Sequence, residues 1–196
     1  MCSSDLRGQV SNFDTDARIK EILSRRIMIL DGAHGTLIQS RKLTEADYRG
    51  ERFAGHGKDV RLNGDLLNIT QPAIIEDIHF QYLEAGCDII ETNTFTSNAI
   101  SQAEYGLEGH AAEMNRAGVA CARAAIKRYF LNAPERPVFI AASVGPTSRT
   151  ASVSQDVNNP ASRGVTFDQL RDAYYEQVRA LVEAGANRVC QALVRL

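Results

Sequence analysis

The fold class is decided by residues 84–95, which read Glu84-Ala85-Gly86-Cys87-Asp88-Ile89-Ile90-Glu91-Thr92-Asn93-Thr94-Phe95. A glycine after a helical segment is typical of a helix end, and the apolar run that follows suits a short buried strand. The first part of this pattern recurs as Glu183-Ala184-Gly185-Ala186-Asn187. A repeated order of helix, glycine, acidic or amide residue and strand indicates parallel strands joined by helical crossovers.

The same alternation continues on both sides of this stretch. Apolar runs predict strands over 27–30, 89–92 and 138–142, each followed by polar residues. Apolar residues at helical spacing predict helices, and their caps agree: Pro72 can open one, and Gly86 can end it. The predicted helices cover 16–25, 72–86, 110–130 and 166–183, the last with Thr166 and Gln169 in capping-box spacing. Residues 41–63 are polar and rich in glycine, which predicts a long irregular excursion.

Strands that alternate with helices form either a doubly wound sheet or an eightfold barrel. The barrel is favoured because polar clusters follow the strands, and because no Gly-x-Gly-x-x-Gly follows the first strand. A complete barrel takes eight strands and about 250 residues. The 196 residues therefore predict an α/β fold that is a partial (β/α)8 TIM barrel, about the first four strands with their helices.

Composition excludes several classes of protein. Apolar residues make up 44% of the chain and charged residues 23%, which is ordinary for a globular domain with one core. The net charge is -2 with scattered basic residues, so we expect no nucleic acid and no membrane as partners. There is no apolar stretch of about 18 residues and no signal peptide core, so we expect a cytoplasmic protein. The four cysteines show no paired spacing and are expected to be buried.

The first polar cluster, residues 31–36, follows the strand over 27–30. The Asp31 carboxylate can bind the ammonium of a ligand, and the backbone N–H groups of Gly32 and Ala33 can bind its carboxylate. The other interpretation is a plain glycine turn in which Asp31 caps the next helix.

The second cluster ends a buried strand with Glu91, Thr92, Asn93 and Thr94. A polar side chain that faces the barrel interior can pair only with a ligand or another site residue, so Glu91, Asn93 and Thr94 are candidates for substrate binding. A polar network that only closes the barrel top is the alternative.

The third cluster runs from Gly145 to Thr150 and follows the strand over 138–142. Its Arg149, helped by loop amides near Gly145 and Thr147, can hold an anion. The alternative is an ordinary solvated loop.

These clusters, with Asn68-Ile69-Thr70-Gln71-Pro72 and residues 167–185, resemble the homocysteine S-methyltransferase family, above all the homocysteine-binding module of cobalamin-dependent methionine synthase. The similarity covers roughly residues 26–185. The long excursion that contains Gly50-Glu51-Arg52-Phe53 and the run over 102–108 resemble that enzyme more than its betaine-dependent or sulfonium-dependent relatives.

The resemblance implies methyl transfer from methylcobalamin, recharged by methyltetrahydrofolate, to the sulfur of homocysteine, which gives methionine. It implies zinc that holds the sulfur as a thiolate, and it implies cobalamin and folate modules as partners. It assigns the amino-acid end of homocysteine to Asp31, Gly32 and Ala33, supported by Glu91, Asn93 and Thr94.

The chain also departs from the family. The family zinc is held by three cysteines whose sequence contexts are missing here and are expected beyond Leu196. We therefore expect no metal ligands in this chain, no bound cofactor and no activity of the chain alone. His34 stands where the family usually has Met and is interpreted as a tolerated substitution, not as a ligand.

The two ends of the chain are expected to differ from the rest. Residues 1–8 are expected to be a non-native leader, and residues 9–186 the barrel portion. Residues 187–196 are expected to be a mis-joined tail, because Arg188 and Gln191 suit a buried strand poorly.

Two other functions stay open at this point. One is a half-module that binds an amino acid without chemistry, and the other is a homocysteine methyltransferase with a betaine or sulfonium donor. A misassembled gene without a cellular role is the third possibility.

Overall fold

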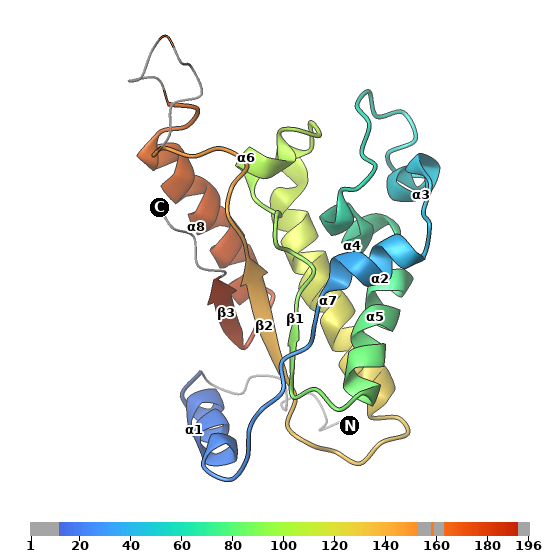
Figure 1. Cartoon of the computed structure of the whole chain (residues 1–196), viewed down its shortest axis with the longest axis vertical. Helices are drawn as coiled ribbons and strands as arrows, with labels where there is room; N and C mark the ends of the chain where they lie inside the picture. Colours follow the sequence, from blue (N-terminus) through green and yellow to red (C-terminus); the bar gives the residue numbers. More distant parts are fainter. Residues whose placement is uncertain (1–11, 153–157, 159–162, 192–196) are drawn as a thin grey trace, which may run out of the picture.

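A computed structural model describes residues 12–152, 158 and 163–191. In this part of the chain, helices pack beside a sheet of three strands in the order β1-β2-β3 (Figure 1). The elements in chain order are α1 (Asn12–Leu23), α2 (His34–Ser40), α3 (Glu45–Arg49), η1 (Gly64–Leu66), α4 (Leu67–Thr70), α5 (Pro72–Glu84), β1 (Ile89–Glu91), α6 (Ala99–Gln102), η2 (Glu108–His110), α7 (Ala111–Tyr129), β2 (Phe139–Val144), α8 (Phe167–Glu183) and β3 (Arg188–Gln191).

All strand pairs in the sheet are parallel. In the register, Ile89 of β1 lies opposite Phe139 of β2, and Ala141 of β2 lies opposite Arg188 of β3. The helices α7 and α8 pack against β2 and against each other. The predicted α/β class with parallel strands and helical crossovers is confirmed, and the polar clusters after β1 and β2 meet at the carboxyl end of the sheet.

The predicted strand over 27–30 is wrong in its extent. Only Leu30 pairs with the sheet, in a single parallel bridge to Ile89. Ile27 is 80% exposed and Ile29 is 53% exposed, so this apolar run is not buried on both faces as predicted. The segment still follows β1, because Asp31 donates its backbone N–H to the Ile89 carbonyl at 2.9 Å. The apolar composition of this segment therefore predicted more strand pairing and more side-chain burial than the structure has.

The predicted helix ends are confirmed at two equivalent places. Gly86 and Gly185, which follow α5 and α8, have φ angles of 97° and 88°, a left-handed conformation that favours glycine. The N–H of the next residue bonds to the carbonyl five positions earlier, at 3.2 Å for Cys87 and 3.1 Å for Ala186. This is the Schellman ending, and it turns both helices back toward the sheet.

The residue after each of these turns bonds to the neighbouring strand with its side chain. The Asp88 carboxylate accepts the Ile29 N–H at 3.0 Å, and the Asn187 amide oxygen accepts the Ile140 N–H at 2.9 Å. The repeat in sequence is therefore a repeat in structure, in which a side-chain oxygen begins the pairing of two segments.

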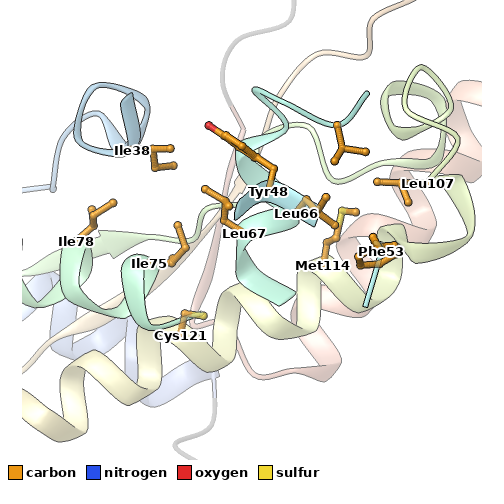
Figure 2. Close-up of a cluster of buried hydrophobic side chains, with 11 residues drawn as sticks. Ile38, Tyr48, Phe53, Leu66, Leu67, Ile75, Ile78, Leu107, Met114 and Cys121 are labelled. Atoms are coloured by element: carbon orange, nitrogen blue, oxygen red, sulfur yellow. The ribbon is translucent and has the colours of Figure 1, made fainter. Parts of the chain in front are cut away.

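The excursion over 41–63 is more ordered than its composition predicted. It contains α3, whose start carries a capping box between Thr44 and Asp47. Tyr48, Phe53 and Val60 are buried in a cluster with side chains from α2, α4, α5 and α7, most of which Figure 2 shows. The excursion thus forms part of the core instead of a free loop.

Arg188, the arginine of β3, has a charged partner. The sequence predicted that Arg188 would lack one, but it forms an ion pair with Asp16 of α1, the blue helix below the sheet in Figure 1. The expected leader over 1–8 and the end of the expected tail, residues 192–196 with Leu196, lie outside the described residues. None of the helices described in the structure is long and apolar enough to cross a membrane.

We expect Asp88→Ala to lower the free energy of unfolding by about 1–3 kcal/mol, because it removes a buried carboxylate that pairs with the half-exposed Arg26, and it leaves the Ile29 N–H without its acceptor. The Asp88 side chain is 3% exposed, and both of its oxygens accept hydrogen bonds from Arg26 at 2.7 Å. Urea denaturation measures the change.

The matched control is Asp172→Ala, which removes an exposed pair with Arg171 and should cost less than about 1 kcal/mol. The bonds from Arg26 lower the pKa of Asp88, so the difference between wild type and Asp88→Ala should shrink as the pH falls below about 4. Equal losses for the two variants at neutral pH would contradict the role of Asp88.

Candidate functional site

A cavity of about 430 Å³ lies at the carboxyl end of β1. Four regions of the chain form it: the turn before α2 with α2 itself, the end of the excursion with η1, the end of β1 with the residues that follow, and the end of β2. The lining residues are Asp31, Gly32, Ala33, His34, Gly35, Ile38, Leu62, Gly64, Asp65, Glu91, Thr92, Asn93, Phe95, Thr96 and Ser143.

The Asp31 carboxylate is held in place by the backbone of β1. Its two oxygens accept the Glu91 N–H at 3.1 and 3.0 Å. Burial raises the pKa of Asp31 to about 7, and the bond from the Glu91 N–H only partly opposes this. Asp31 does not cap α2, whose N-cap is Ala33 without a side-chain bond. The interpretation of Asp31 as a helix cap is therefore wrong, and its carboxylate lies in the cavity wall at a desolvation cost.

The second cluster divides between the cavity and the core. Glu91 and Asn93 line the cavity, and the Asn93 amide donates to the Gly64 carbonyl at 2.8 Å. Thr94 is fully buried and does not line the cavity; its hydroxyl donates to the Ser143 carbonyl at 2.8 Å. The structure therefore brings Glu91 and Asn93 next to Asp31, and it places Thr94 behind the wall as a support.

The third cluster is split in a similar way. Gly145 is packed under the cavity residue Phe95, since a Cβ atom on Gly145 would come within 2.6 Å of the Phe95 ring. The Thr147 hydroxyl bonds to the Arg149 carbonyl at 2.6 Å and is not part of the cavity wall. The Arg149 side chain lines a different cavity, between α6 and α8. Only Gly145 of this cluster thus supports the cavity around Asp31.

Asp65 is a cavity residue that the sequence did not reveal. One of its oxygens accepts three bonds, from the Thr96 N–H at 2.7 Å, the Thr96 hydroxyl at 3.0 Å and the Ser97 hydroxyl at 2.8 Å. Burial nevertheless raises the pKa of Asp65 to about 6, because the lost hydration outweighs these bonds. The only sequence signal for a buried Asp65 was its position as a single charged residue between Gly64 and two leucines.

A pair of histidines lies beside Asp31. The Nε2 atom of His34, the first residue of α2, is 3.3 Å from Nδ1 of His79 in α5. The rings meet edge to face, with centroids 4.8 Å apart. Burial lowers the pKa of His34 to about 4 and of His79 to about 3, so both rings are neutral at neutral pH. His79 was missed because it reads as one more position on the buried face of α5.

The described cysteine side chains do not fit a metal site. Cys87 and Cys121 are buried in different hydrophobic clusters. Burial raises the pKa of each thiol to about 12, which disfavours the thiolate that a metal needs. Cys2 and the side chain of Cys190 lie outside the described residues. The cysteine-held zinc implied by the family resemblance therefore finds no ligands among the thiols that the structure describes.

The expectation that metal ligands lie only beyond Leu196 stays a prediction, but the structure adds a group of potential ligands that includes two histidines. Asp31, His34 and His79 bring three potential ligand atoms within 4.8 Å of one another. The sequence did not reveal this group, because its members come from a turn, a helix start and the middle of another helix. Whether the family cysteines lie beyond Leu196 stays a prediction.

Comparison with known proteins gives one family. The family model for homocysteine S-methyltransferase matches residues 28–191, which is most of the chain.

Solved structures give the same fold. The homocysteine methyltransferase MmuM from Escherichia coli, in its metallated form, superimposes with a TM-score of 0.66 at 22% identity, over 88% of this chain and 56% of that one. Its oxidized form gives 0.64 at 22% identity, over 87% and 55%. The chain thus spans about half the length of these relatives.

We expect Asp65→Asn to change how stability depends on pH. The folded-state pKa of about 6 exceeds the unfolded value near 4, so the ionised carboxylate makes wild type less stable as the pH rises from about 4 to 7. The asparagine of the variant does not titrate, so the stability of Asp65→Asn relative to wild type should increase by roughly 1–3 kcal/mol across this window. Urea denaturation at several pH values measures this, and a constant difference between the two proteins would contradict the burial of an ionised Asp65.

Proposed function

Since the chain belongs to the homocysteine S-methyltransferase family, we propose that its cavity binds the amino-acid end of homocysteine. The observation that carries this proposal is the partly buried Asp31 carboxylate in the cavity wall, fixed by the Glu91 N–H. A ligand's ammonium beside Asp31 would replace the hydration that this carboxylate has lost.

The charges of the cavity wall support a cationic group in this position. Asp31, Asp65 and Glu91 all line the cavity, and none of the lining residues is a lysine or an arginine. We propose that Gly32 and Ala33 receive the carboxylate of the ligand through their backbone, while Glu91 and Asn93 complete the wall. Thr94 would act from behind, through its bond to the Ser143 carbonyl.

We propose that the chain is the first part of a (β/α)8 barrel that transfers a methyl group to the sulfur of homocysteine and forms methionine. In the family, zinc supplies a thiolate for this reaction. The described thiols of this chain do not fit that zinc, so the role proposed for these residues is to bind and orient the amino-acid end. We further propose that the chain alone does not transfer a methyl group.

For the methyl donor we propose methylcobalamin, carried by a separate module. Two segments of the sequence resemble cobalamin-dependent methionine synthase in particular, and they contact each other in the fold. His56 Nε2 bonds to the Tyr105 carbonyl at 2.7 Å, and Lys58 Nζ donates to the Ala103 and Glu104 carbonyls at 3.1 and 3.2 Å. The two segments thus form one local unit, and the proposal of this donor rests on their sequence resemblance to that enzyme. A betaine or sulfonium donor is the alternative.

We expect Asp31→Asn to weaken homocysteine binding at least about tenfold, because the ammonium loses its charged partner. Calorimetric titration measures the affinity. The exposed Asp168, replaced in Asp168→Asn, is the matched control and should have no effect. For wild type the affinity should fall as the pH drops below about 7, because protonation removes the negative charge of Asp31.

An analogue of homocysteine without its amino group separates the contact of Asp31 with the ammonium from the contacts of the cavity with the rest of the ligand. Wild type and Asp31→Asn should bind it equally weakly. If Asp31→Asn binds homocysteine as wild type does, the role of Asp31 is wrong.

A chimera tests the reaction itself. We expect residues 9–185, joined to the rear part of a homologous barrel, to methylate homocysteine, and we expect methylcobalamin to be a better donor than betaine or a sulfonium compound. The 196-residue chain should show no turnover with any of the three. Turnover with betaine alone would overturn the proposed donor, and an inactive but folded chimera would count against the proposed reaction.

A further inference from the structure

Three potential metal ligands from three parts of the chain meet beside the cavity. They are Asp31, which follows the bridge to β1, His34 at the start of α2, and His79 in the middle of α5. One ligand atom from each, a carboxylate oxygen and two imidazole nitrogens, all lie within 4.8 Å of one another.

We propose that Asp31, His34 and His79 form a site for a divalent transition-metal ion of the Zn²⁺ type. This site differs from the cysteine site that the family resemblance implies, and it departs from our expectation that the chain up to Leu196 carries no metal ligand. It does not depend on homocysteine binding, although Asp31 takes part in both proposals.

The spacing of the two imidazoles fits such an ion. Zinc–nitrogen bonds of about 2.0–2.1 Å at a tetrahedral angle place the two nitrogens about 3.3 Å apart. His34 Nε2 and His79 Nδ1 are 3.3 Å apart.

The hydrogen bonding of the pair leaves room for an ion as well. Between two neutral rings only one lone pair can accept the shared proton, whereas an ion uses the lone pairs of both facing nitrogens. When Nδ1 of His79 binds the ion, the ring proton is on Nε2, which has no hydrogen-bond partner among the described residues. The carboxylate of Asp31 would supply the negative charge that a divalent ion needs in a desolvated position.

The position of the cluster gives the ion access to a further ligand. Asp31 and His34 line the cavity, while His79 lies behind them and is completely buried. Three protein ligands with one open position toward a cavity are the arrangement typical of zinc sites that take part in chemistry. The fourth ligand would therefore come from the cavity, as water or as a donor atom of a bound molecule.

The test is a titration of the purified chain with Zn²⁺ alone. Calorimetry measures the affinity and the number of ions bound, and thermal unfolding measures the melting temperature. We expect one ion per chain and a higher melting temperature with the ion than without it. His34→Met, which introduces the residue typical of the family, and His79→Asn should each weaken binding at least about tenfold. The control is His110→Gln, because His110 also lies next to a carboxylate, at 3.4 Å from Glu113, but outside the cluster.

Titration with Co²⁺ identifies the ligand atoms. We expect visible bands of a four-coordinate ion without the ultraviolet band of sulfur–cobalt charge transfer. His79 is buried, so its replacement can impair folding. The decisive variant is therefore His34→Met, because His34 is partly exposed. Circular dichroism checks that this variant is folded. No stoichiometric binding by wild type, unchanged binding by a folded His34→Met, or a sulfur–cobalt band would each overturn the proposed site.

Discussion

The described fold depends on two carboxylates that attach the segment over 26–31 to β1. Asp88 accepts the Ile29 N–H at the start of this contact, and Asp31 accepts the Glu91 N–H at its end. Between them the backbone contributes one parallel bridge and three hydrogen bonds: the Ile29 carbonyl accepts the N–H groups of Asp88 and Ile89, and the Ile89 carbonyl accepts the Asp31 N–H. The two carboxylates thus extend a short backbone ladder at both of its ends. One consequence is that Asp31 has a fixed position before any ligand arrives, which is the condition for a preorganised site.

The sequence predicts best what depends on neighbouring residues. The start of α5 at Pro72, its end at Gly86 and the capping box of Thr166 with Gln169 are local features, and all three are confirmed. The parallel sheet follows from the repeated order of elements. The strand over 27–30 fails because burial of an apolar run depends on what packs against it, which composition cannot tell.

The site is predictable to the extent that it follows strands. Asp31 and Asn93 follow paired segments and Glu91 ends β1, so parallel pairing brings all three to one cavity. Asp65 and His79 come from a turn and from a helix, and only the tertiary fold brings them near Asp31. The other errors have local causes. Thr94 lies behind the wall, and the loop after β2 turns Arg149 toward a different cavity.

Asp31 connects the two proposed occupants of this cavity, because a carboxylate that has lost its hydration favours a nearby cation of either kind. An ammonium group satisfies it by charge and hydrogen bonds, and this requires a protonated amine. A metal ion satisfies it by coordination and then offers its open position to a lone pair, which requires a deprotonated amine or thiol. The two modes therefore respond to pH in opposite directions with respect to the ligand. The histidine pair decides between them, since a cavity with Met at position 34 would keep the ammonium mode and lose a ligand of the metal mode.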